Sequence, residues 1–260
     1  MRQVTSAADR TKKVGLILIG DELLNASRTD KHLQTVIGML QERGMKLNWM
    51  HLLGDDKDEL ITLFRTSMAS NDVVFSCGGI GATPDDLTRE CAAIASNQNF
   101  MRHPEAQSLI EEKFGESAYP HRILMSDLPE KANIIPNPIN QVPGFSIDDH
   151  HFVPGFPSMA TPMIQWVLDT KYQHLFSNHP DVDVRWDLHE VAESELIPTM
   201  NNLLDSFPEV ALSSLPSSEK HGWLIDFGLK GQRNKVEEAA KWFEAQLQTM
   251  HISFDYRGEN

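Results

Sequence analysis

A short segment rich in glycine and aspartate could bind a phosphate group. It reads Gly78-Gly-Ile-Gly-Ala-Thr-Pro-Asp-Asp-Leu-Thr88. Glycines allow sharp turns and leave backbone amides free to point at one anion, as in phosphate-binding turns. We expect Gly78, Gly79 and Gly81 to supply amides and Thr83 a hydroxyl. Glycine also favours ordinary turns, but the added Thr-Pro-Asp-Asp-x-Thr favours a functional interpretation.

Two adjacent acids, Asp85 and Asp86, follow this turn, and we expect them at the start of a helix over residues 84–95. Their alternative role is to cap that helix. Side by side, two carboxylates repel each other and any phosphate. A divalent cation would resolve that conflict, and oxygen ligands suit Mg²⁺, Mn²⁺ or Co²⁺, which the sequence does not distinguish.

Other acidic segments could join the same site. Asp21 and Glu22 follow a short apolar run, Asp30 comes nine residues after Asp21, and Gly54-Asp-Asp56 forms a third acidic turn. Asp30 alone is equally well explained as a helix cap, and the Asp55 turn as an exposed helix start. As a hypothesis, two or more of Asp21, Asp55, Asp85 and Asp86 hold the cation, and a remaining aspartate orients or deprotonates a water molecule.

The elements between these segments predict an α/β domain with a mostly parallel sheet. Ligands of such sheets bind at the carboxyl ends of the strands, which would bring the acidic segments and the glycine turn together. The predicted elements are a strand over Val14–Ile19, a helix around Leu33–Leu40, an extended stretch over Lys46–Leu53, a helix around Leu60–Met68, a strand over Asp72–Ser76, and helices over His103–Phe114 and Ser158–Asp169.

The second half of the chain has its own pattern. Residues 182–260 read as strand, helix, strand, strand, helix, strand, which is the ferredoxin-like order of a small α+β domain. Pro198 should sit in the first turn of the first of these helices. We therefore expect a flexible N-terminal arm over 1–12, a main domain over 13–175, a linker near Ser177–Asp181 and a small domain over 182–260.

Composition excludes several classes of protein. With 37 acidic against 23 Lys and Arg residues the net charge is −14, which argues against binding nucleic acid or an anionic membrane. No apolar run approaches the roughly 20 residues of a membrane helix, and the polar N-terminus is unlike a secretory signal. We expect a cytoplasmic protein. Cys77 and Cys91 predict no disulfide framework, Cys77 reads as a buried structural thiol, and the adjacent His150 and His151 as turn residues.

Together the motifs resemble one family, the molybdopterin-binding (MoaB/Mog-type) domain, closest to the branch at the N-terminus of competence/damage-inducible protein A (CinA). The resemblance covers residues 13–175 and includes Asn133–Asn137, Pro143-Gly-Phe145 and Pro154-Gly-Phe-Pro-Ser-Met159. It implies a three-layer α/β sandwich. The tail from 182 resembles the small domain that follows this module, and we expect no amidase domain of the full-length members within these 260 residues.

The resemblance also implies a function. In the CinA branch it implies metal-dependent hydrolysis of ADP-ribose or a similar nucleotide diphosphate, with Asp86 and Asp55 as catalytic acids. Asp21, Asp85 and Asp86 would hold the metal, and Glu22, Asp30 and Thr88 would add ligand contacts. The alternatives are a molybdopterin- or nucleotide-binding protein without hydrolysis, and a non-catalytic sensor or scaffold. A homodimer is the expected assembly.

The chain departs from the family pattern in two places. Asn25-Ala-Ser-Arg28 stands where many members have a glycine, and Asp30-Lys-His32 stands where Asp-Thr-Asn or Asp-Ser-Asn is common. His32 in place of asparagine would change ligand contacts. Substrate choice is therefore the least determined part of the implied function.

Overall fold

A computed structural model describes residues 12–177, 181–217 and 224–259. The chain divides into two compact units, one ending at Phe176 and one beginning at Ser177. The predicted arm over residues 1–12 lies outside the described residues, apart from Lys12, whose ammonium group pairs with Asp149. In the described residues, no helix is both long and apolar enough to cross a membrane.

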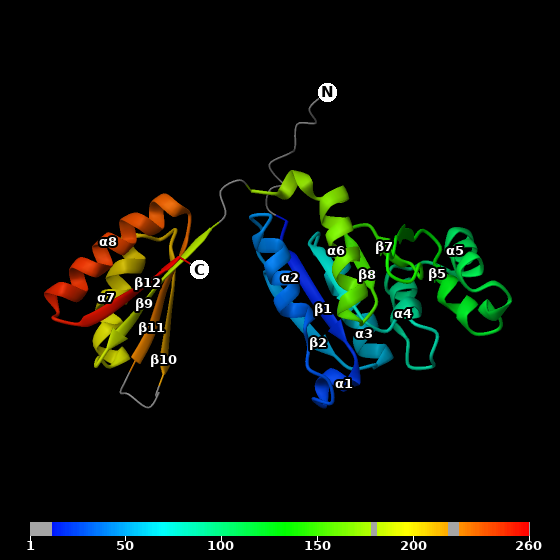
Figure 1. Cartoon of the computed structure of the whole chain (residues 1–260), viewed down its shortest axis with the longest axis horizontal. Helices are drawn as coiled ribbons and strands as arrows, with labels where there is room; N and C mark the ends of the chain where they lie inside the picture. The colour runs from blue at the N-terminus through cyan, green and yellow to red at the C-terminus, as the bar shows by residue number, and fades with distance from the viewer. Residues whose placement is uncertain (1–11, 178–180, 218–223, 260) are drawn as a thin grey trace, which may run out of the picture. The chain divides into compact units, whose positions relative to one another are not determined.

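The first unit is built on a six-stranded sheet in the order β2-β1-β3-β8-β7-β6 (Figure 1). Strand β1 runs parallel to β2 and β3, and β3 parallel to β8, whereas β7 pairs antiparallel with β8 and β6. The predicted mostly parallel sheet is thus confirmed. The strands are β1 (Val14–Ile19), β2 (Trp49–Leu53), β3 (Val73–Cys77), β6 (Asn133–Ile135), β7 (Gly144–Ile147) and β8 (His150–Val153).

Helices cover both faces of this sheet and make three layers (Figure 1). Leu16 and Leu18 of β1 pack toward α2 and α6, whereas Ile17 and Ile19 pack toward α3 and α4. Because β1 is buried on both faces, its sequence is apolar throughout rather than alternating. The helices are α1 (Asp21–Leu24), α2 (His32–Gln41), α3 (Lys57–Met68), α4 (Thr88–Ala95) and α6 (Pro157–Lys171), which is followed by the short 3₁₀ helix η4 (Gln173–Leu175).

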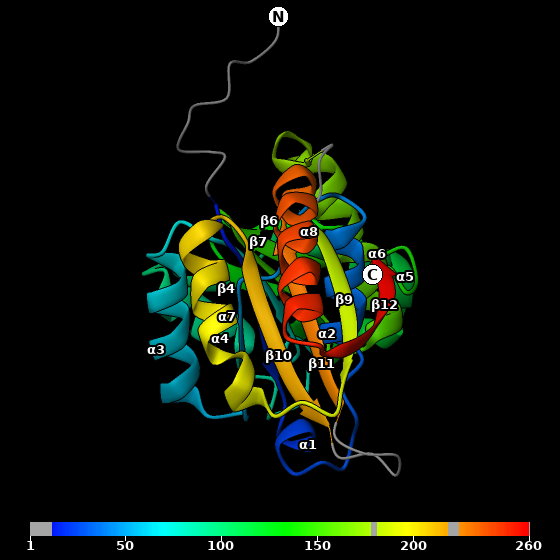
Figure 2. The same ribbon diagram turned by 90° about the vertical axis from the view of Figure 1, so that its left-hand side faces the viewer.

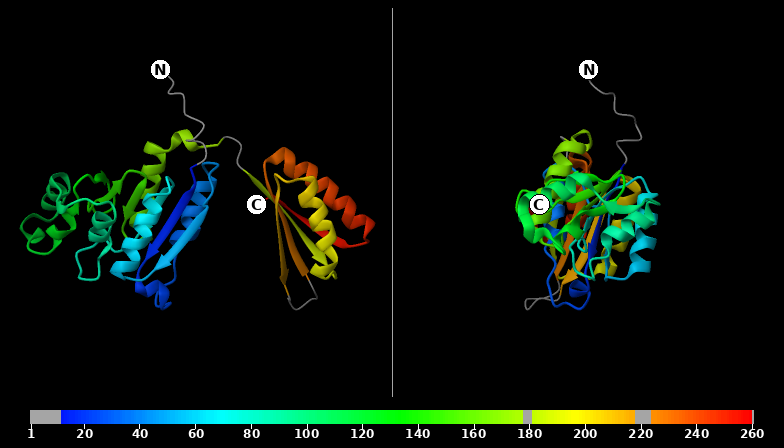
Figure 3. Two further views of the ribbon diagram at one scale, coloured as in Figure 1. Left: turned by 180° about the vertical axis from the view of Figure 1, so that it is seen from behind. Right: turned by 90° about the vertical axis from the view of Figure 1, so that its right-hand side faces the viewer.

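Residues 100–129 form an excursion beside the main sheet (Figure 3). Strand β4 (Phe100–Arg102) pairs antiparallel with β5 (Asp127–Pro129). Between them lie α5 (Pro104–Phe114) and two 3₁₀ helices, η2 (Gly115–Ala118) and η3 (Arg122–Ser126), around a small core of Ile110, Ala118 and Ile123. The predicted helix over His103–Phe114 is confirmed, with His103 at its N-cap.

The prediction that His150 and His151 lie in a turn is wrong. Both belong to β8 and both are buried, on opposite faces of the sheet. His150 Nε2 hydrogen-bonds Ser76 Oγ at 2.8 Å, and burial lowers the pKa of His150 to about 3. His151 hydrogen-bonds Ser146 Oγ at 2.8 Å and the Tyr172 hydroxyl at 2.7 Å. A strand that is covered on both faces can bury two adjacent polar residues if each finds a partner.

The second unit has the predicted ferredoxin-like order, with helices on one face of an antiparallel sheet (Figure 2). The strand order is β10-β11-β9-β12, and Trp186, Phe227 and Phe243 fill the space between sheet and helices. The elements are β9 (Val182–His189), α7 (Glu193–Ser206), β10 (Ala211–Ser217), β11 (Leu224–Gly231), α8 (Arg233–Thr249) and β12 (Ser253–Glu259).

The predicted position of Pro198 in the first turn of its helix is wrong. Helix α7 begins at Glu193, so Pro198 lies inside it. The reason is an N-terminal contact that the apolar spacing did not reveal: the Glu195 carboxylate accepts the Ala192 amide at 3.3 Å. That contact starts the helix before the first apolar residue, Leu196.

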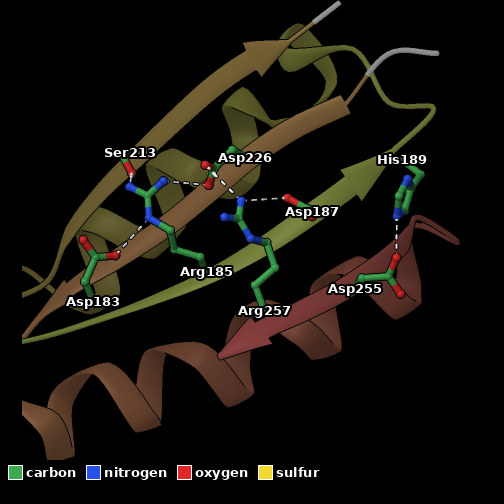
Figure 4. Close-up of polar contacts among 8 residues, drawn as sticks. All are labelled: Asp183, Arg185, Asp187, His189, Ser213, Asp226, Asp255 and Arg257. Carbon is green, nitrogen blue, oxygen red and sulfur yellow. Dashed lines mark hydrogen bonds and ion pairs between the residues drawn. The ribbon is translucent and has the colours of Figure 1, made fainter. Parts of the chain in front are cut away.

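The face of this sheet opposite the helices carries charged residues that pair with one another (Figure 4). Arg185 and Arg257 both donate to the Asp226 carboxylate, at 2.7 and 3.2 Å. Further pairs are Arg185–Asp183, Arg257–Asp187 and His189–Asp255. Strand β9 alternates buried apolar and half-exposed charged residues because one face of the sheet packs against the helices and the other carries these ion pairs.

Candidate functional site

A cavity of about 590 Å³ opens at the carboxyl edge of the parallel strands of the first unit. The segments that follow β1, β2, β3 and β8 all contribute to its wall, as expected for an open α/β sheet. One part of the wall is polar and the other apolar. Its wall includes Glu22, Arg28, Asp55, the 78–83 turn, Asp85, Asp86, Phe114, Met125, Val142, Gly155, Phe156 and Met159.

The glycine turn after β3 has a backbone that only glycine adopts comfortably. Gly78 and Gly79 have φ values of +117° and +65°. A Cβ atom on Gly78 would lie 2.2 Å from the Ile19 carbonyl oxygen, and a Cβ on Gly155 would lie 3.3 Å from Gly78 Cα. The ends of β1, β3 and β8 therefore approach one another backbone to backbone, and the turn that follows β3 lines the cavity.

Asp86 holds the far end of this turn in place. Its Oδ2 atom accepts the backbone N–H of Thr83 at 2.9 Å and the Thr83 hydroxyl at 2.5 Å. The same hydroxyl lies close enough to Asp85 to lower the pKa of that exposed carboxyl. The carboxylate folds back on Thr83, residues 84–85 form a turn, and α4 begins only at Thr88. The prediction that Asp85 and Asp86 start the helix is wrong.

The acids after β1 and β2 are directly connected. The Asp21 amide donates to Asp55 Oδ2 and the Asp55 amide donates to Asp21 Oδ1, both at 3.2 Å. Burial raises the pKa of Asp55, and the charges of Asp21, Glu22 and Asp85 raise it further, against the lowering effect of the Asp21 amide. Carboxylates from three loops thus act on one another electrostatically beside the glycine turn.

The donor set suits one mode of cation binding. Across the described residues, no group of three or more His, Cys, Asp and Glu side chains is arranged to hold a metal ion. Mg²⁺, however, is usually held by one or two carboxylates together with waters and substrate phosphates rather than by a cage of protein ligands. Asp55 and Asp85 fit this mode, because both line the cavity and their charges interact.

The predicted site residues divide into two groups. The first group lines the cavity and comprises Glu22, Asp55, Gly78, Gly79, Gly81, Thr83, Asp85 and Asp86. Asp21 is connected to this group because its amide donates to the Asp55 carboxylate. Asp30 and Thr88 are described but do not line it. The Asp30 carboxylate instead accepts the amides of His32 and Leu33 at the start of α2, which is the capping role. The buried Thr88 hydroxyl lies against Gly79 without a hydrogen-bond partner.

Two arginines near the site were not predicted. Arg28 lines the cavity. Arg89, in the first turn of α4, is buried and donates to the carbonyls of Gly81 at 2.7 Å, Asp127 at 2.9 Å and Leu124. It ties the glycine turn to the excursion. No local pattern indicates these contacts, because the 124–127 carbonyls are distant in sequence.

Cys77 forms the end of β3 directly before the glycine turn and is fully buried, as predicted for a structural thiol. Burial raises its pKa well above the ordinary range. Cys91 of α4 is also buried, and burial raises its pKa to about 11. Neither thiol has the low pKa of a nucleophile.

A parallel sheet with a glycine turn and several acids at its carboxyl edge defines a small-molecule-binding α/β domain. The sequence model of the family described as "Probable molybdopterin binding domain" matches residues 15–174. The chain therefore belongs to this molybdopterin-binding domain family, as the motifs predicted.

Two sequence relatives and one solved structure are consistent with this family assignment. A CinA-like protein of Syntrophotalea carbinolica is 30% identical over 58% of this chain and 39% of its own length. A CinA-like protein of Escherichia coli is 28% identical over 74% of this chain and 50% of its own length. The chain thus spans half or less of the length of these relatives. The crystal structure of CinA from Thermoplasma acidophilum, titled as of unknown function, covers 62% of this chain and 98% of its own with a TM-score of 0.57 at 25% identity.

Proposed function

We propose that this protein hydrolyses a nucleotide diphosphate such as ADP-ribose with the help of a divalent cation. The observation that carries the proposal is the position of the Asp55 carboxylate. It lies in the same cavity as the glycine turn, and burial, together with the charges of Asp21, Glu22 and Asp85, raises its pKa. Acids crowded beside an anion-binding turn make chemical sense when a cation neutralises them.

The cavity residues have separate roles in the proposed hydrolysis. The amides of Gly78, Gly79 and Gly81 hold one phosphate, and Asp86 keeps Thr83 and the turn in shape. Asp85 would hold the cation, which when bound lowers the pKa of a coordinated water and neutralises the diphosphate. Asp55 accepts the proton of the attacking water. Water adds to one phosphorus, the bridging P–O bond breaks, and AMP and ribose 5-phosphate leave.

The apolar part of the wall supports a ligand with a flat ring. Phe114, Met125, Val142, Phe156 and Met159 line the cavity together with the polar turn. A nucleotide offers both a ring and phosphates to such a mixed surface. One Escherichia coli relative is named "NMN amidohydrolase-like protein YfaY", a name that also refers to a nucleotide.

The second candidate is a molybdopterin- or nucleotide-binding protein without hydrolysis. The family description favours a pterin ligand, and the described residues contain no ready-made cage of three metal-binding side chains. Under this alternative the glycine turn holds the pterin phosphate and the acids only shape the loops. The expected homodimer is not needed by either candidate and stays a prediction.

Incubation of the purified protein with ADP-ribose and a panel of divalent cations, with AMP release as the readout, tests the proposal. We expect AMP only when a cation is present, and none from the Asp86→Asn variant. No AMP with any cation or nucleotide diphosphate, together with release of a fluorescent pterin on denaturation, would replace the proposal by the binding alternative.

A further inference from the structure

Arg28 is the one lysine or arginine among the described residues that line the cavity. Four carboxylates line the same wall, those of Glu22, Asp55, Asp85 and Asp86. The wall therefore carries an excess of negative charge, although its glycine turn is built for an anion. A ligand with more than one phosphate needs positive charge beyond the turn. Apart from a bound cation, Arg28 is the group among the described residues of this wall that can supply that positive charge.

The main chain of Arg28 is fixed while its guanidinium group remains available. The Arg28 amide donates to the Glu22 carbonyl at 3.0 Å, and the preceding residues are tied by the Ser27 amide to the Asn25 side chain. The side chain is 61% exposed and approaches the Glu22 carboxylate only to 4.0 Å. That distance is too long for a hydrogen bond, so the donors of the guanidinium fork stay free for a ligand.

Phe156 lies on the other side of this guanidinium group. The Arg28 Cζ atom stands 5.9 Å from the centre of the Phe156 ring, within the range of a cation–π contact. Phe156 is 53% exposed and also lines the cavity. Because the two side chains come from the segments after β1 and β8, their contact spans the ends of the sheet beside the glycine turn after β3.

We propose that Arg28 binds the second phosphate of a diphosphate ligand and so selects diphosphates over monophosphates. This inference rests on the proposed nucleotide-diphosphate ligand but not on its hydrolysis. The glycine turn holds the first phosphate. Arg28 and the glycine turn line the same cavity, so one diphosphate bound there can contact both. On binding, the guanidinium group exchanges its long contact with Glu22 for two hydrogen bonds to phosphate oxygens.

The experiment measures dissociation constants in Mg²⁺ buffer for two non-hydrolysed ligands, α,β-methylene-ADP and AMP. Arg28→Ala should weaken α,β-methylene-ADP binding by about 10- to 100-fold, the worth of a charge-assisted pair. AMP binding should change by less than about threefold, the effect of one exposed charge. Arg28→Lys should fall between, because lysine keeps the charge but not the fork.

The matched control is Lys31→Ala. Lys31 lies three residues away, is exposed and does not line the cavity, so this variant removes the same charge from the same segment. Equal losses for both ligands in Arg28→Ala, or an equal loss in Lys31→Ala, would overturn the assignment. If the wild-type protein binds α,β-methylene-ADP but hydrolyses no nucleotide diphosphate, hydrolysis fails while these constants still decide the role of Arg28. If it binds neither ligand, the role given to Arg28 fails, and AMP release from ADP-ribose decides the hydrolysis separately.

Discussion

Asp21 and Asp55 each donate a backbone N–H to the carboxylate of the other, at 3.2 Å in both directions. This reciprocal pair joins the segment after β1 to the segment after β2. It also brings two negative charges together at the edge of the cavity. The geometry is therefore well defined, but it keeps the Asp55 carboxylate in a place where burial and its neighbours oppose its ionisation.

The first prediction concerns Asp55→Asn. The folded protein raises the pKa of Asp55 above its ordinary 3.8, so stability from its protonated form is present at low pH and is lost as the pH rises through the folded-state pKa. At neutral pH the neutral amide should raise stability by less than about 1 kcal/mol, because the site is half-exposed and screened. Turnover should disappear. Thermal unfolding and AMP release measure the two effects.

Asp58→Asn is the control for that variant. Asp58 is exposed in the first turn of α3, where its charge favours the helix. Its removal should lower stability by a few tenths of a kcal/mol and leave turnover intact. A loss of stability in Asp55→Asn, or full activity, would contradict the role given to Asp55.

The second prediction compares two glycines of positive φ. A Cβ on Gly79 would lie 2.3 Å from Thr88 Oγ1, whereas Gly115 has open space around it. Gly79→Ala should therefore cost about 1–3 kcal/mol and deform the turn, and nucleotide affinity should fall. Gly115→Ala should also cost about 1–3 kcal/mol, because its φ of 55° and ψ of −135° suit glycine, but it should leave affinity unchanged. Urea unfolding and nucleotide titration measure both. Unchanged affinity in Gly79→Ala would show that the turn does not hold the ligand.

The third prediction concerns Arg89→Lys. A lysine cannot donate to Gly81 and to the 124–127 carbonyls at once, so buried carbonyls lose their partner and stability should fall by about 1–3 kcal/mol. Nucleotide affinity should fall as well, because the turn loses its support. Arg102→Lys is the control: Arg102 pairs with the Asp127 carboxylate at a half-exposed site, and its replacement should cost below about 1 kcal/mol. Equal effects of the two variants would contradict the role of Arg89.

The fourth prediction is a steep loss of stability in mild acid. Burial lowers the pKa of His150 to about 3 and that of His151 well below its ordinary 6.5. Stability from both neutral rings is fully present above pH 6.5 and is lost as the pH falls toward the folded-state values. The slope below pH 6.5 should approach about 2.7 kcal/mol per pH unit for two histidines.

Unfolding of His150→Phe combined with Ser76→Ala tests that slope, since the double variant removes both partners of one buried hydrogen bond. The slope should fall by about half. The exposed His121→Gln serves as the reference. A slope that is unchanged in the double variant would mean that His150 does not stay neutral in the folded protein.

The elements of the sheet could be predicted because burial on both faces leaves a plain signal. Val14–Ile19 is apolar throughout and forms β1 with the same bounds. The same double burial misled the interpretation of β8, whose histidines look like surface residues until Ser76, Ser146 and Tyr172 supply their partners. Those partners lie on other elements, so the local sequence does not reveal them.

The candidate site was predictable where glycine and acids follow strands, because strand ends meet at one edge of a parallel sheet. Arg28 and Arg89 were not, since their roles depend on side-chain reach rather than on sequence spacing. Asp30 was ambiguous in the sequence, and the structure gives it the capping geometry. The local sequence does not show which polar side chains point toward the cavity and which hydrogen-bond to neighbouring backbone groups.

The burial of both cysteines gives the molecule a built-in reporter. A thiol reagent can modify Cys77 only when the end of β3 opens and admits both solvent and reagent, because the folded environment disfavours the reactive thiolate. The rate of alkylation of Cys77 therefore measures the local opening of the end of β3, and the rate at Cys91 measures the opening around α4. A ligand that binds the glycine turn should stabilise the folded end of β3 and so slow the labelling of Cys77 more than that of Cys91. Mass spectrometry of the labelled protein can then screen for ligands without a substrate assay.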